Sequence, residues 1–398
     1  MHVVIVTTSF ARFPGDAIDH LIMGVARPLV ESGVEVTVVA PHAPGAARRE
    51  TMEGVRVRRY IYAWPHRLER LAYGDGIPVT LSRNPAMWFQ TPALVLAGAA
   101  EVLAATRRAD LIHAFWTPNA VVSAPAALGR RLPLLLTVLG SDLRTMPRWL
   151  NRAAFRTATG VVCYTAETKE YLDRYSYPDP IFNISCIPDL RRLEADGPLE
   201  PALAEWCRQA GAVVTFVARL EAFKDPLGFI RAAPSVLRQH PGARFLVAGD
   251  GPLRRDAEDL VRRLGLSKAV WLTGQRADVG AILRASTVFV ANSPVTNYGS
   301  ASILEAMAMG LPVVLTDVGD PVGAFRQKDY VERVRPEDPE DLARGIGRVL
   351  ADNARRRHLA AMAGQFLEDH GFTEAQMTRR HLEAYELLCR RGRSRRHP

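Results

Sequence analysis

The sequence predicts an α/β protein built from two doubly wound, Rossmann-like parallel-sheet domains. At 398 residues the chain is longer than one hydrophobic core comfortably supports, so two domains are expected. Short apolar runs alternate with helix-length segments in both halves, which is typical of parallel strands covered by helices on both faces. Ligands of such sheets bind outside the carboxyl ends of the strands, so we expect a site in a cleft between the domains.

The first half begins with an apolar run at residues 2–7 and contains six expected strands. These lie at residues 2–7, 35–41, 55–62, 110–114, 134–139 and 160–164, with helices at 17–32, at 93–107 and from 166. Gly33 suits the position just past the first helix. The alternation then stops in a polar, proline-containing stretch, which predicts an N-terminal domain of residues 1–190 and an interdomain linker at 191–211.

The second half repeats the alternation. Strands are expected at 212–217, 244–248, 269–273 and 287–291, and helices at 227–239, 253–264, 279–285, 341–352 and 354–368. Thr373 and Gln376 have the spacing of a capping box, which predicts a further helix over residues 373–389. The C-terminal domain is therefore expected at 212–372, followed by that helix and a basic tail at 390–398.

Residues 293–317, SPVTNYGSASILEAMAMGLPVVLTD, are the most informative segment of the chain. They predict a strand end, a glycine-containing loop, a short helix and a second buried strand. Ser302 and Glu305 have capping-box spacing, Gly310 suits the position past a helix end, and Pro312 prevents continuation. A helix N-terminus presents unpaired N–H groups and about half a positive charge, which favours a phosphate. The alternative is that Glu305 only caps its own helix.

Two cations, Arg219 and Lys224, follow directly on the strand expected at 212–217. An arginine fork together with a lysine point charge is a common way to hold a diphosphate. Taken alone, both residues could equally form surface salt bridges. Because the same domain contains the anion-favouring helix, the diphosphate interpretation is preferred.

Several protein classes are disfavoured by motif and composition. Gly249-Asp250-Gly251-Pro252 follows a strand but lacks the third glycine of a dinucleotide fingerprint, and P-loop, HExxH and nucleophile-elbow motifs are missing from the sequence. The four cysteines lie far apart without metal-ligand spacing, as in a reduced cytoplasmic protein. The chain opens on a strand-like run rather than a signal peptide, so export is not expected.

The net charge of +9 is concentrated at the C-terminus. Arg390–Pro398 contains five arginines and no acid, which leaves +4 for the rest of the chain. Since no nucleic-acid-reading motif is present, no nucleic-acid partner is expected. Attraction of this tail to an anionic membrane surface is expected instead, with a solvated tail without a partner as the alternative.

One apolar stretch, residues 87–105, could be taken for a membrane-spanning helix. Gln90, Pro92 and Glu101 interrupt it, and its unbroken apolar part is too short to span a bilayer. We expect a helix packed inside a domain, near an amphiphilic substrate.

Taken together, these motifs resemble glycosyltransferase family 4, whose members have the GT-B fold of two Rossmann-like domains facing across a cleft. The resemblance covers nearly the whole chain and rests on TTSFARFPGD, APHAPG, YAWP, LAYGDGI, DLIHAFW, TVLGSD, VARLEAFKDP, LVAGDGPLR, LTGQRADV and LEAMAMGLPVV. It implies transfer of a sugar from a nucleotide-sugar to a polysaccharide or lipid-linked glycan, by a cytoplasmic protein peripheral on the inner face of the cell membrane. Retention at the anomeric carbon is implied. No metal or other cofactor is expected, because cationic side chains and a helix dipole take the metal's place.

The resemblance also implies roles for individual residues. Arg219 and Lys224 should clamp the donor diphosphate, and Glu305 should bind the ribose hydroxyls. Further donor contacts are expected from Gly249, Asp250, Gln275, Arg276, Asn297, Tyr298, Gly299, Ser300, Ala301 and Ser302. On the acceptor side of the cleft the expected residues are Gly15, Asp16, His113, Trp116 and Asp142, the last in the turn Gly140-Ser141-Asp142.

Two of these acceptor-side residues have open alternatives. His113 could be a structural residue at a strand end. Trp116 could stack on a sugar or merely fill the cleft wall.

Three positions depart from the family's usual pattern. Asn297 replaces the first of two glutamates, Phe115 replaces a histidine, and Leu139 replaces the histidine before Gly140. The residues expected to face the sugar are thus altered, whereas those expected to face the diphosphate are kept. The alternative function is therefore a catalytically degenerate member that binds nucleotide or glycan as a scaffold for a partner enzyme.

Overall fold

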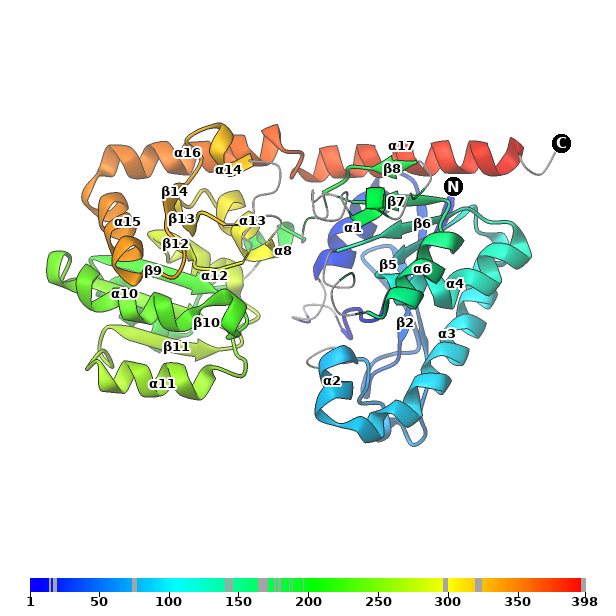
Figure 1. Cartoon of the computed structure of the whole chain (residues 1–398), viewed down its shortest axis with the longest axis horizontal. Coiled ribbons are helices and arrows are strands. Elements are labelled where there is room, and N and C mark those ends of the chain that lie inside the picture. The colour runs from blue at the N-terminus through cyan, green and yellow to red at the C-terminus, as the bar shows by residue number, and fades with distance from the viewer. Residues whose placement is uncertain are drawn as a thin grey trace. The chain divides into compact units, whose positions relative to one another are not determined.

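The computed structural model describes the whole chain except residues 14–15, 17–19, 74–76, 140–142, 144–145, 164–170, 175–176, 178–179, 186, 188, 196, 296–299, 319–323 and 395–398. The chain divides into two compact units (Figure 1). The first unit comprises Met1–Cys186 and Glu374–Pro398, and the second comprises Ile187–Thr373. Each unit has its own sheet, which confirms the predicted two-domain α/β class.

The first unit contains an eight-stranded sheet of order β3-β4-β2-β1-β5-β6-β7-β8. Its strands are β1 (His2–Val6), β2 (Glu35–Pro41), β3 (Arg49–Met52), β4 (Val55–Tyr60), β5 (Leu111–Phe115), β6 (Leu134–Thr137), β7 (Gly160–Val162) and β8 (Ile181–Phe182). Every described pair of these strands is parallel except β3–β4. Val3, Val4 and Ile5 of the central strand are completely buried, which explains its unbroken apolar sequence.

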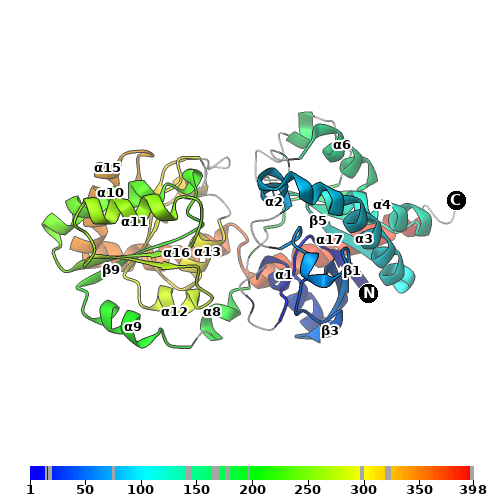
Figure 2. The ribbon, with the colours of Figure 1, turned by 90° about the horizontal axis from the view of Figure 1, so that it is seen from below.

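Helices cover both faces of this sheet (Figure 2). On one face α3 (Thr91–Ala105), α4 (Thr117–Arg130) and α6 (Arg148–Thr157) contribute to a single hydrophobic core. On the other lie α1 (His20–Glu31) and the terminal helix α17 (Glu374–Ser394). The remaining short helices are η1 (His66–Leu68), α2 (Ile77–Arg83), η2 (Pro85–Gln90) and η3 (Thr106–Arg108).

The second unit contains a six-stranded sheet of order β11-β10-β9-β12-β13-β14, in which all described pairs are parallel. Its strands are β9 (Ala212–Val217), β10 (Ala243–Ala248), β11 (Val270–Gly274), β12 (Val288–Ala291), β13 (Val313–Thr316) and β14 (Glu332–Val334). The first strand of the unit, β9, lies between β10 and β12, so the chain order reverses beside it. This reversal is the topological switch point at which ligands of such sheets bind.

Helices also cover both faces of the second sheet (Figure 2). On one face α10 (Pro226–Gln239), α11 (Arg254–Arg263) and α15 (Pro339–Ala351) form the main core, and on the other α9 (Pro201–Arg208) and α12 (Val279–Arg284) form a smaller one. The remaining helices are α8 (Arg191–Ala195), η4 (Ala222–Lys224), α13 (Ala301–Ala308), α14 (Ala324–Gln327) and α16 (Asn353–Asp369).

The stretch expected as a linker, residues 191–211, differs from the prediction. It contains α8 and α9 and belongs to the second unit. Leu203 and Cys207, four residues apart, pack against the sheet, whereas Glu205 and Arg208 of the same helix are exposed. The polar, proline-containing composition therefore concealed an amphipathic helix.

The terminal helix also differs from the prediction. α17 belongs to the first unit and continues to Ser394, so the first five residues of the expected tail are helical. Residues 395–398 lie outside the described part of the chain.

His113 of β5, which was expected on the acceptor side of a cleft, instead holds α17. Its side chain is completely buried; Nδ1 is hydrogen-bonded to the Tyr385 hydroxyl at 2.8 Å and Nε2 to the Thr137 hydroxyl at 2.7 Å. The ring of His381, also on α17, lies 5.5 Å from that of His113. Burial lowers the pKa of His113 well below its ordinary value and that of His381 to about 4. Both imidazoles are therefore neutral at pH 7.

We predict that acid weakens the attachment of α17. An imidazole with a lowered pKa in the fold stays neutral while the unfolded chain takes up a proton, so its stabilising effect is complete above about pH 6.5 and is lost below it. For His381 the loss should extend down to the folded pKa of about 4, at about 1.4 kcal/mol per pH unit. Urea unfolding across this pH range measures the slope.

The matched control for this prediction is His381→Gln, which does not titrate. In the wild type, His381 Nδ1 lies 3.0 Å from the Met377 carbonyl, and the glutamine amide can supply a donor there. The variant should lose less stability than the wild type on acidification. Parallel curves of unfolding free energy against pH would contradict the prediction.

Candidate anion-binding site

The carboxyl ends of β9 and β12 meet at the switch point of the second unit, and several of the expected site residues gather there. A small pocket lies between the two strand ends and the start of α13. It is lined by Phe216, Val217, Ala218, Lys224, Phe289, Val290, Ala291, Asn292, Ser293, Ser300 and Ser302. The structure thus brings Lys224 to one pocket with two serines that lie about eighty residues later in the chain.

The turn after β9 is held by Asp225. This residue precedes α10 in a left-handed conformation, with φ 45° and ψ 57°, and its carboxylate accepts a hydrogen bond from the Gly228 N–H at 2.9 Å. The Asn292 amide donates to the Asp225 carboxylate at 2.9 Å and to its carbonyl at 3.0 Å. A Cβ at Gly228 would lie 2.0 Å from the Asp225 carboxylate, so only glycine fits beside this cap. The first turn of α10 is therefore bound to the end of β12.

A second set of hydrogen bonds continues this connection. The Ser293 hydroxyl donates to the Phe223 carbonyl at 2.8 Å, and the Thr316 hydroxyl of β13 donates to the Ser293 carbonyl. We call Phe223, Asp225, Asn292, Ser293 and Thr316 the polar tether. The tether holds the loop that carries Lys224 against two neighbouring strands.

Lys224 is half-buried at the pocket wall. Burial lowers the pKa of its ammonium group, and the nearby Glu221 carboxylate opposes that shift. A partly desolvated ammonium group interacts more strongly with an anion than a fully hydrated one.

The helix α13 begins at Ala301, with Ser300 as its N-cap at φ −67° and ψ 123°. The predicted capping box is therefore wrong, because Ser300 occupies the cap while Ser302 and Glu305 lie inside the helix, where Glu305 is 5% exposed. The predicted helix end is confirmed. Gly310 has φ 69°, its N–H donates to Met307, and the next N–H donates to Ala306, as in a Schellman motif.

Two features of the pocket's lining favour negative charge. Its wall carries the Lys224 ammonium group, and Ser300 and Ser302 place it at the first turn of α13. The first N–H groups of a helix and its macrodipole favour negative charge.

Arg219 lies on the surface just after β9, one of the two strands whose ends line this pocket. Its side chain is 47% exposed and pairs with Glu221 at 2.7 Å. Arg219 is not among the residues that line the pocket described above, so its contact with a diphosphate stays a prediction.

The glycines of Gly249-Asp250-Gly251 allow two chain segments to run close together. Gly249 has φ 146°, and a Cβ on it would lie 1.9 Å from the Ala218 carbonyl. The Asp250 carbonyl accepts from the Leu220 N–H at 2.9 Å, and its exposed carboxylate accepts from the Gly251 N–H at 2.7 Å. These residues therefore shape the loop after β9.

Gln275 and Arg276, expected beside the base, follow β11. Gln275 is exposed. Arg276 binds both carboxylate oxygens of Asp278, at 2.8 and 2.6 Å, and contacts Glu200 at 3.0 Å. These bonds raise the pKa of Arg276 and lower that of Asp278. Arg276 thus joins the β11 loop to the start of α9, and its contact with a base stays a prediction.

The expected acceptor-side residues occupy different settings in the first unit. Asp16 is buried and accepts from Arg12 Nε at 2.7 Å. Trp116 is half-exposed before α4 with φ 64°, an uncommon conformation for a bulky residue, and Phe115 is completely buried beside His113. Gly15, Gly140, Ser141, Asp142, Asn297, Tyr298 and Gly299 lie outside the described residues.

A histidine–glutamate cluster in the first unit has a geometry that could hold a metal ion, and sequence reasoning missed it. Glu69 Oε2 lies 2.6 Å from His42 Nδ1 and 3.3 Å from His66 Nδ1. His42 Nε2 faces the Ala46 carbonyl at 2.9 Å, so both of its ring nitrogens face acceptors. The contact with His42 gives the buried Glu69 a partner without a metal. No residue spacing in the sequence signals this cluster.

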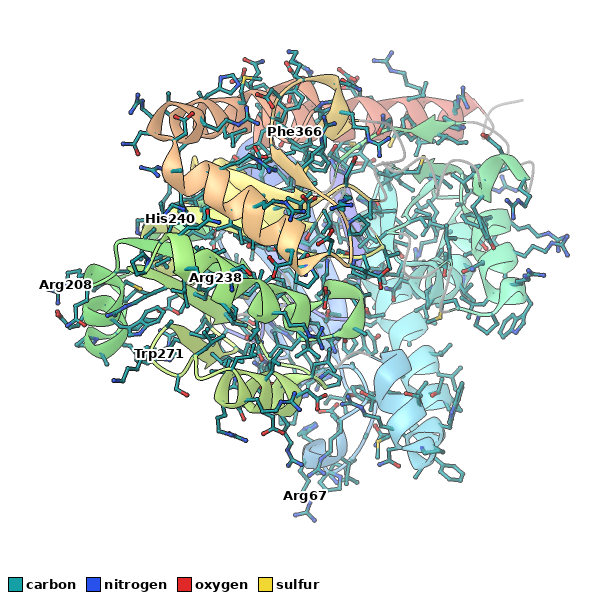
Figure 3. All side chains as sticks on the ribbon, turned by 60° about the vertical axis from the view of Figure 1, so that its left-hand side comes forward. Arg67, Arg208, Arg238, His240, Trp271 and Phe366 are labelled. Atoms are coloured by element: carbon teal, nitrogen blue, oxygen red, sulfur yellow. The ribbon has the colours of Figure 1, made fainter. Side chains whose placement is uncertain are left out.

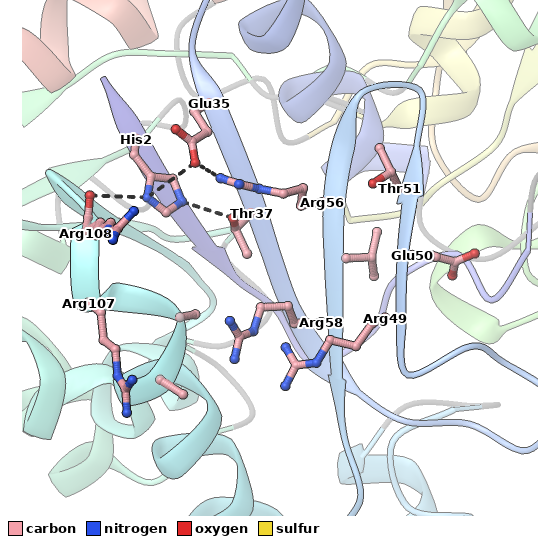
Figure 4. A pocket seen from close by; sticks show the side chains of 13 residues that line it. His2, Glu35, Thr37, Arg49, Glu50, Thr51, Arg56, Arg58, Arg107 and Arg108 are labelled. Atoms are coloured by element: carbon pink, nitrogen blue, oxygen red, sulfur yellow. Dashed lines mark hydrogen bonds and ion pairs between the residues drawn. The ribbon is translucent and has the colours of Figure 1, made fainter.

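A larger pocket of the first unit lies at the amino-terminal end of its strands (Figure 4). Its lining includes several arginines, of which Arg56 pairs with Glu35 and Arg58 pairs with Glu101. His2 Nε2 is hydrogen-bonded to Thr37 at 3.0 Å. Because ligands of doubly wound sheets bind at the opposite, carboxyl end, we assign no function to this pocket.

Fold and site together define a protein with two doubly wound domains and a candidate anion-binding pocket at the switch point of the second. Residues 18–184 match the family described as "Glycosyl transferase 4-like domain", and residues 211–352 match "Glycosyl transferases group 1". The chain belongs to glycosyltransferase family 4, which confirms the resemblance.

Relatives and solved structures agree with this family. An Escherichia coli protein named UDP-Gal:alpha-D-GlcNAc-diphosphoundecaprenol alpha-1,3-galactosyltransferase is 30% identical over 228 residues, covering 52% of this chain and 58% of that protein. The lipopolysaccharide core biosynthesis glycosyltransferase LpsE of Rhizobium meliloti is 30% identical over 217 residues, covering 53% and 61%. The matches thus span less than two thirds of these relatives.

The Anabaena protein HepE, solved with UDP and glucose, superposes with a TM-score of 0.69 over 97% of this chain and 99% of its own, at 18% identity. The GT-B fold predicted from the sequence is confirmed.

We predict that Gly249→Ala destabilises the second unit more than Gly265→Ala does. Both glycines have positive φ, 146° and 69°, but nothing lies within 4 Å of a Cβ at Gly265. The control, Gly265→Ala, should therefore lose only about 1–2 kcal/mol of unfolding free energy, which is the conformational penalty of a residue with a Cβ at positive φ. At Gly249 the clash with the Ala218 carbonyl should add about 1–3 kcal/mol. Urea unfolding compares the two, and equal losses would mean that the close backbone approach is unimportant.

Proposed function

We propose that the protein is a glycosyltransferase that moves a sugar from a nucleotide-sugar to a polysaccharide or lipid-linked glycan. The observation that carries the proposal is the pocket formed by Lys224 and the N-terminus of α13, in a chain of glycosyltransferase family 4. The name of the Escherichia coli relative specifies a UDP-sugar donor and a diphosphoundecaprenol-linked acceptor. That name supports a diphosphate donor and an amphiphilic acceptor here.

On this proposal the pocket acts on the leaving group. When the bond between the anomeric carbon and the diphosphate oxygen breaks, negative charge develops on the diphosphate. Lys224 and the N–H groups of α13, which lie at the pocket, would stabilise that charge. Glu305, buried in α13, would accept hydrogen bonds from the ribose, and Arg219 would leave Glu221 to reach the diphosphate.

Retention and independence of metal ions are part of the proposal. The acceptor oxygen would attack from the face that the diphosphate leaves, and a departing phosphate oxygen would take up the acceptor's proton. Lys224 and the helix dipole would supply the positive charge that a metal otherwise provides. We further propose that the protein acts in the cytoplasm at the inner membrane face. Attraction of Arg390–Pro398 to anionic lipid stays a prediction.

We predict that Lys224→Ala lowers the turnover of a nucleotide-sugar by about 10²–10³-fold, as loss of one preorganised transition-state contact does. Arg219→Ala should have a smaller effect, because its side chain is 47% exposed and its charge is more strongly screened. The matched control is Arg238→Ala on the last turn of α10, labelled in Figure 3, at the other end of that helix from Asp225. Turnover by Lys224→Ala within twofold of the wild type would contradict this assignment.

We also predict that one nucleoside diphosphate stabilises the protein in the presence of EDTA. A ligand at 100 times its dissociation constant adds about 2.7 kcal/mol to the unfolding free energy, which a thermal shift detects readily. UDP, GDP, ADP and their sugar conjugates form the panel, and Lys224→Ala should remove the shift. A shift without any acceptor-dependent release of nucleoside diphosphate would support the scaffold alternative, and a shift that requires a divalent metal would contradict metal independence.

A further inference from the structure

One surface of the first unit, over residues 85–100, has no charged residue, and each of its exposed side chains is apolar. Its exposed side chains are Pro85, Ala86, Trp88, Phe89, Pro92, Ala93, Val95, Leu96 and Ala100. Phe89 is 90% exposed, Leu96 70% and Trp88 59%. A helix on the surface of a soluble protein normally presents polar residues to water. We call these nine residues the apolar face, and its exposure needs an explanation.

The turn after β4 extends the apolar face. Trp64 is 77% exposed and Leu68 45%. The Gln90 side chain donates to the Leu68 carbonyl at 2.8 Å, so this turn lies beside the start of α3. Trp64 and Leu68 therefore continue the apolar surface onto a second segment.

The charged side chains that are exposed in the described part of residues 61–101 are all basic. Arg67 and Arg70 of the same turn are exposed, and Figure 3 shows Arg67 projecting from the protein. Among the described residues between 61 and 101 the acids are Glu69, which is buried against His42, and Glu101, which is paired with Arg49 and Arg58. Exposed aromatic rings flanked by arginines match the headgroup region of an anionic bilayer, whereas a protein partner's surface normally contains charges of both signs.

We propose that the apolar face docks on an anionic lipid bilayer, with Trp88 and Phe89 inserted at the headgroup level and Arg67 and Arg70 facing the lipid phosphates. The segment binds as a helix lying in the interface, as amphipathic anchors do. This surface deepens the proposed function, since a lipid-linked acceptor resides at a bilayer, but the observations that carry it are independent of the transfer reaction.

The segment does not cross the bilayer. By length and composition the helical stretch Pro85–Arg108 is apolar enough to do so. However, Leu94, Gly98 and Val102 are buried against the domain, and a Cβ on Gly98 would lie 3.1 Å from the Tyr60 ring. A helix with one face committed to a sheet cannot be surrounded by lipid. The expectation of a helix packed inside a domain is thus correct for one face and wrong for the other.

Vesicle co-sedimentation of the full chain tests the proposal. The probes are vesicles of phosphatidylcholine mixed with phosphatidylglycerol and vesicles of phosphatidylcholine alone. The wild type should bind the mixed vesicles, and the double variant Trp88→Ser/Phe89→Ser should bind them at least tenfold more weakly. Trp149→Ser is the matched control, because Trp149 is 68% exposed on α6 outside the apolar face. It should bind as the wild type does.

Two further variants separate the contributions of charge and insertion. Arg67→Gln/Arg70→Gln should lose binding to the mixed vesicles chiefly at low salt, because exposed charges are screened within about 10 Å at 0.1 M salt. Trp88→Phe should keep most of the binding, since an apolar ring remains. Lipids brominated near the headgroup should quench the wild type's tryptophan fluorescence, and quenching should fall in Trp88→Phe.

Three outcomes would overturn the proposal. They are failure of the wild type to sediment with either vesicle, binding of the double serine variant as strong as that of the wild type, and an equal loss of binding in Trp149→Ser. A wild type that dimerises in solution through these residues and ignores vesicles would assign the apolar face to a protein interface instead. The nucleotide-induced thermal shift should be the same in the wild type and the double serine variant. A variant that loses vesicle binding but keeps the nucleotide-induced shift therefore has a defect in membrane docking and not in nucleotide binding.

Discussion

The hydrogen bonds that Asn292 and Ser293 make to the loop after β9 are the constraint on which the site of the second unit depends. Asp225 holds a left-handed backbone conformation, which costs a residue with a Cβ about 1–2 kcal/mol. The Asn292 amide and the Gly228 N–H offset that cost by binding its carboxylate, whose pKa burial raises. Without Asn292 the carboxylate would lose one of its partners, which typically costs about 1–3 kcal/mol.

These hydrogen bonds fix the position of Lys224. It lies directly before Asp225, and Phe223 before it is bound to Ser293, so residues on both sides of the lysine are tied to β12. A lysine on a free loop would lose conformational entropy on meeting an anion. Here the fold has already ordered the loop, and partial burial has already weakened the hydration of the ammonium group. An anion that enters the pocket meets a charge that needs little reorganisation.

Sequence reasoning succeeded where the signal is local. The apolar runs predicted most strands of both sheets, though not the short strands β3, β8 and β14. The Gly310-Leu311-Pro312 break predicted the end of α13, because both signals depend on neighbouring residues. It failed where contacts are distant. His113 and Tyr385 are 272 residues apart, so nothing near His113 indicates that a terminal helix will cover it. The cap of α13 was misplaced because Ser300 and Ser302 both suit an N-cap, and only the backbone conformation distinguishes them.

The sequence also does not indicate which side of a uniformly apolar helix faces solvent. α3 has almost no polar residue to mark an outer face, so composition favours burial all round. In the structure Leu94, Gly98 and Val102 face the core, which leaves Val95 and Leu96 exposed. That geometry follows from Tyr60 packing over Gly98, a contact between residues 38 positions apart that no local pattern encodes.

The proposed bilayer docking of the apolar face and the proposed donor site in the second unit would meet two different requirements of one transfer reaction. On the proposed function, a nucleotide-sugar is a soluble anion that would reach the Lys224 pocket by diffusion and be attracted by its charge. A lipid-linked acceptor is confined to the bilayer, and its polar glycan extends only a short way into water. A protein held at that surface meets such an acceptor at a raised effective concentration without any additional contact to the glycan itself. The acceptor side then needs fewer polar contacts of its own, which agrees with Phe115 and Leu139 standing where the family usually has histidines.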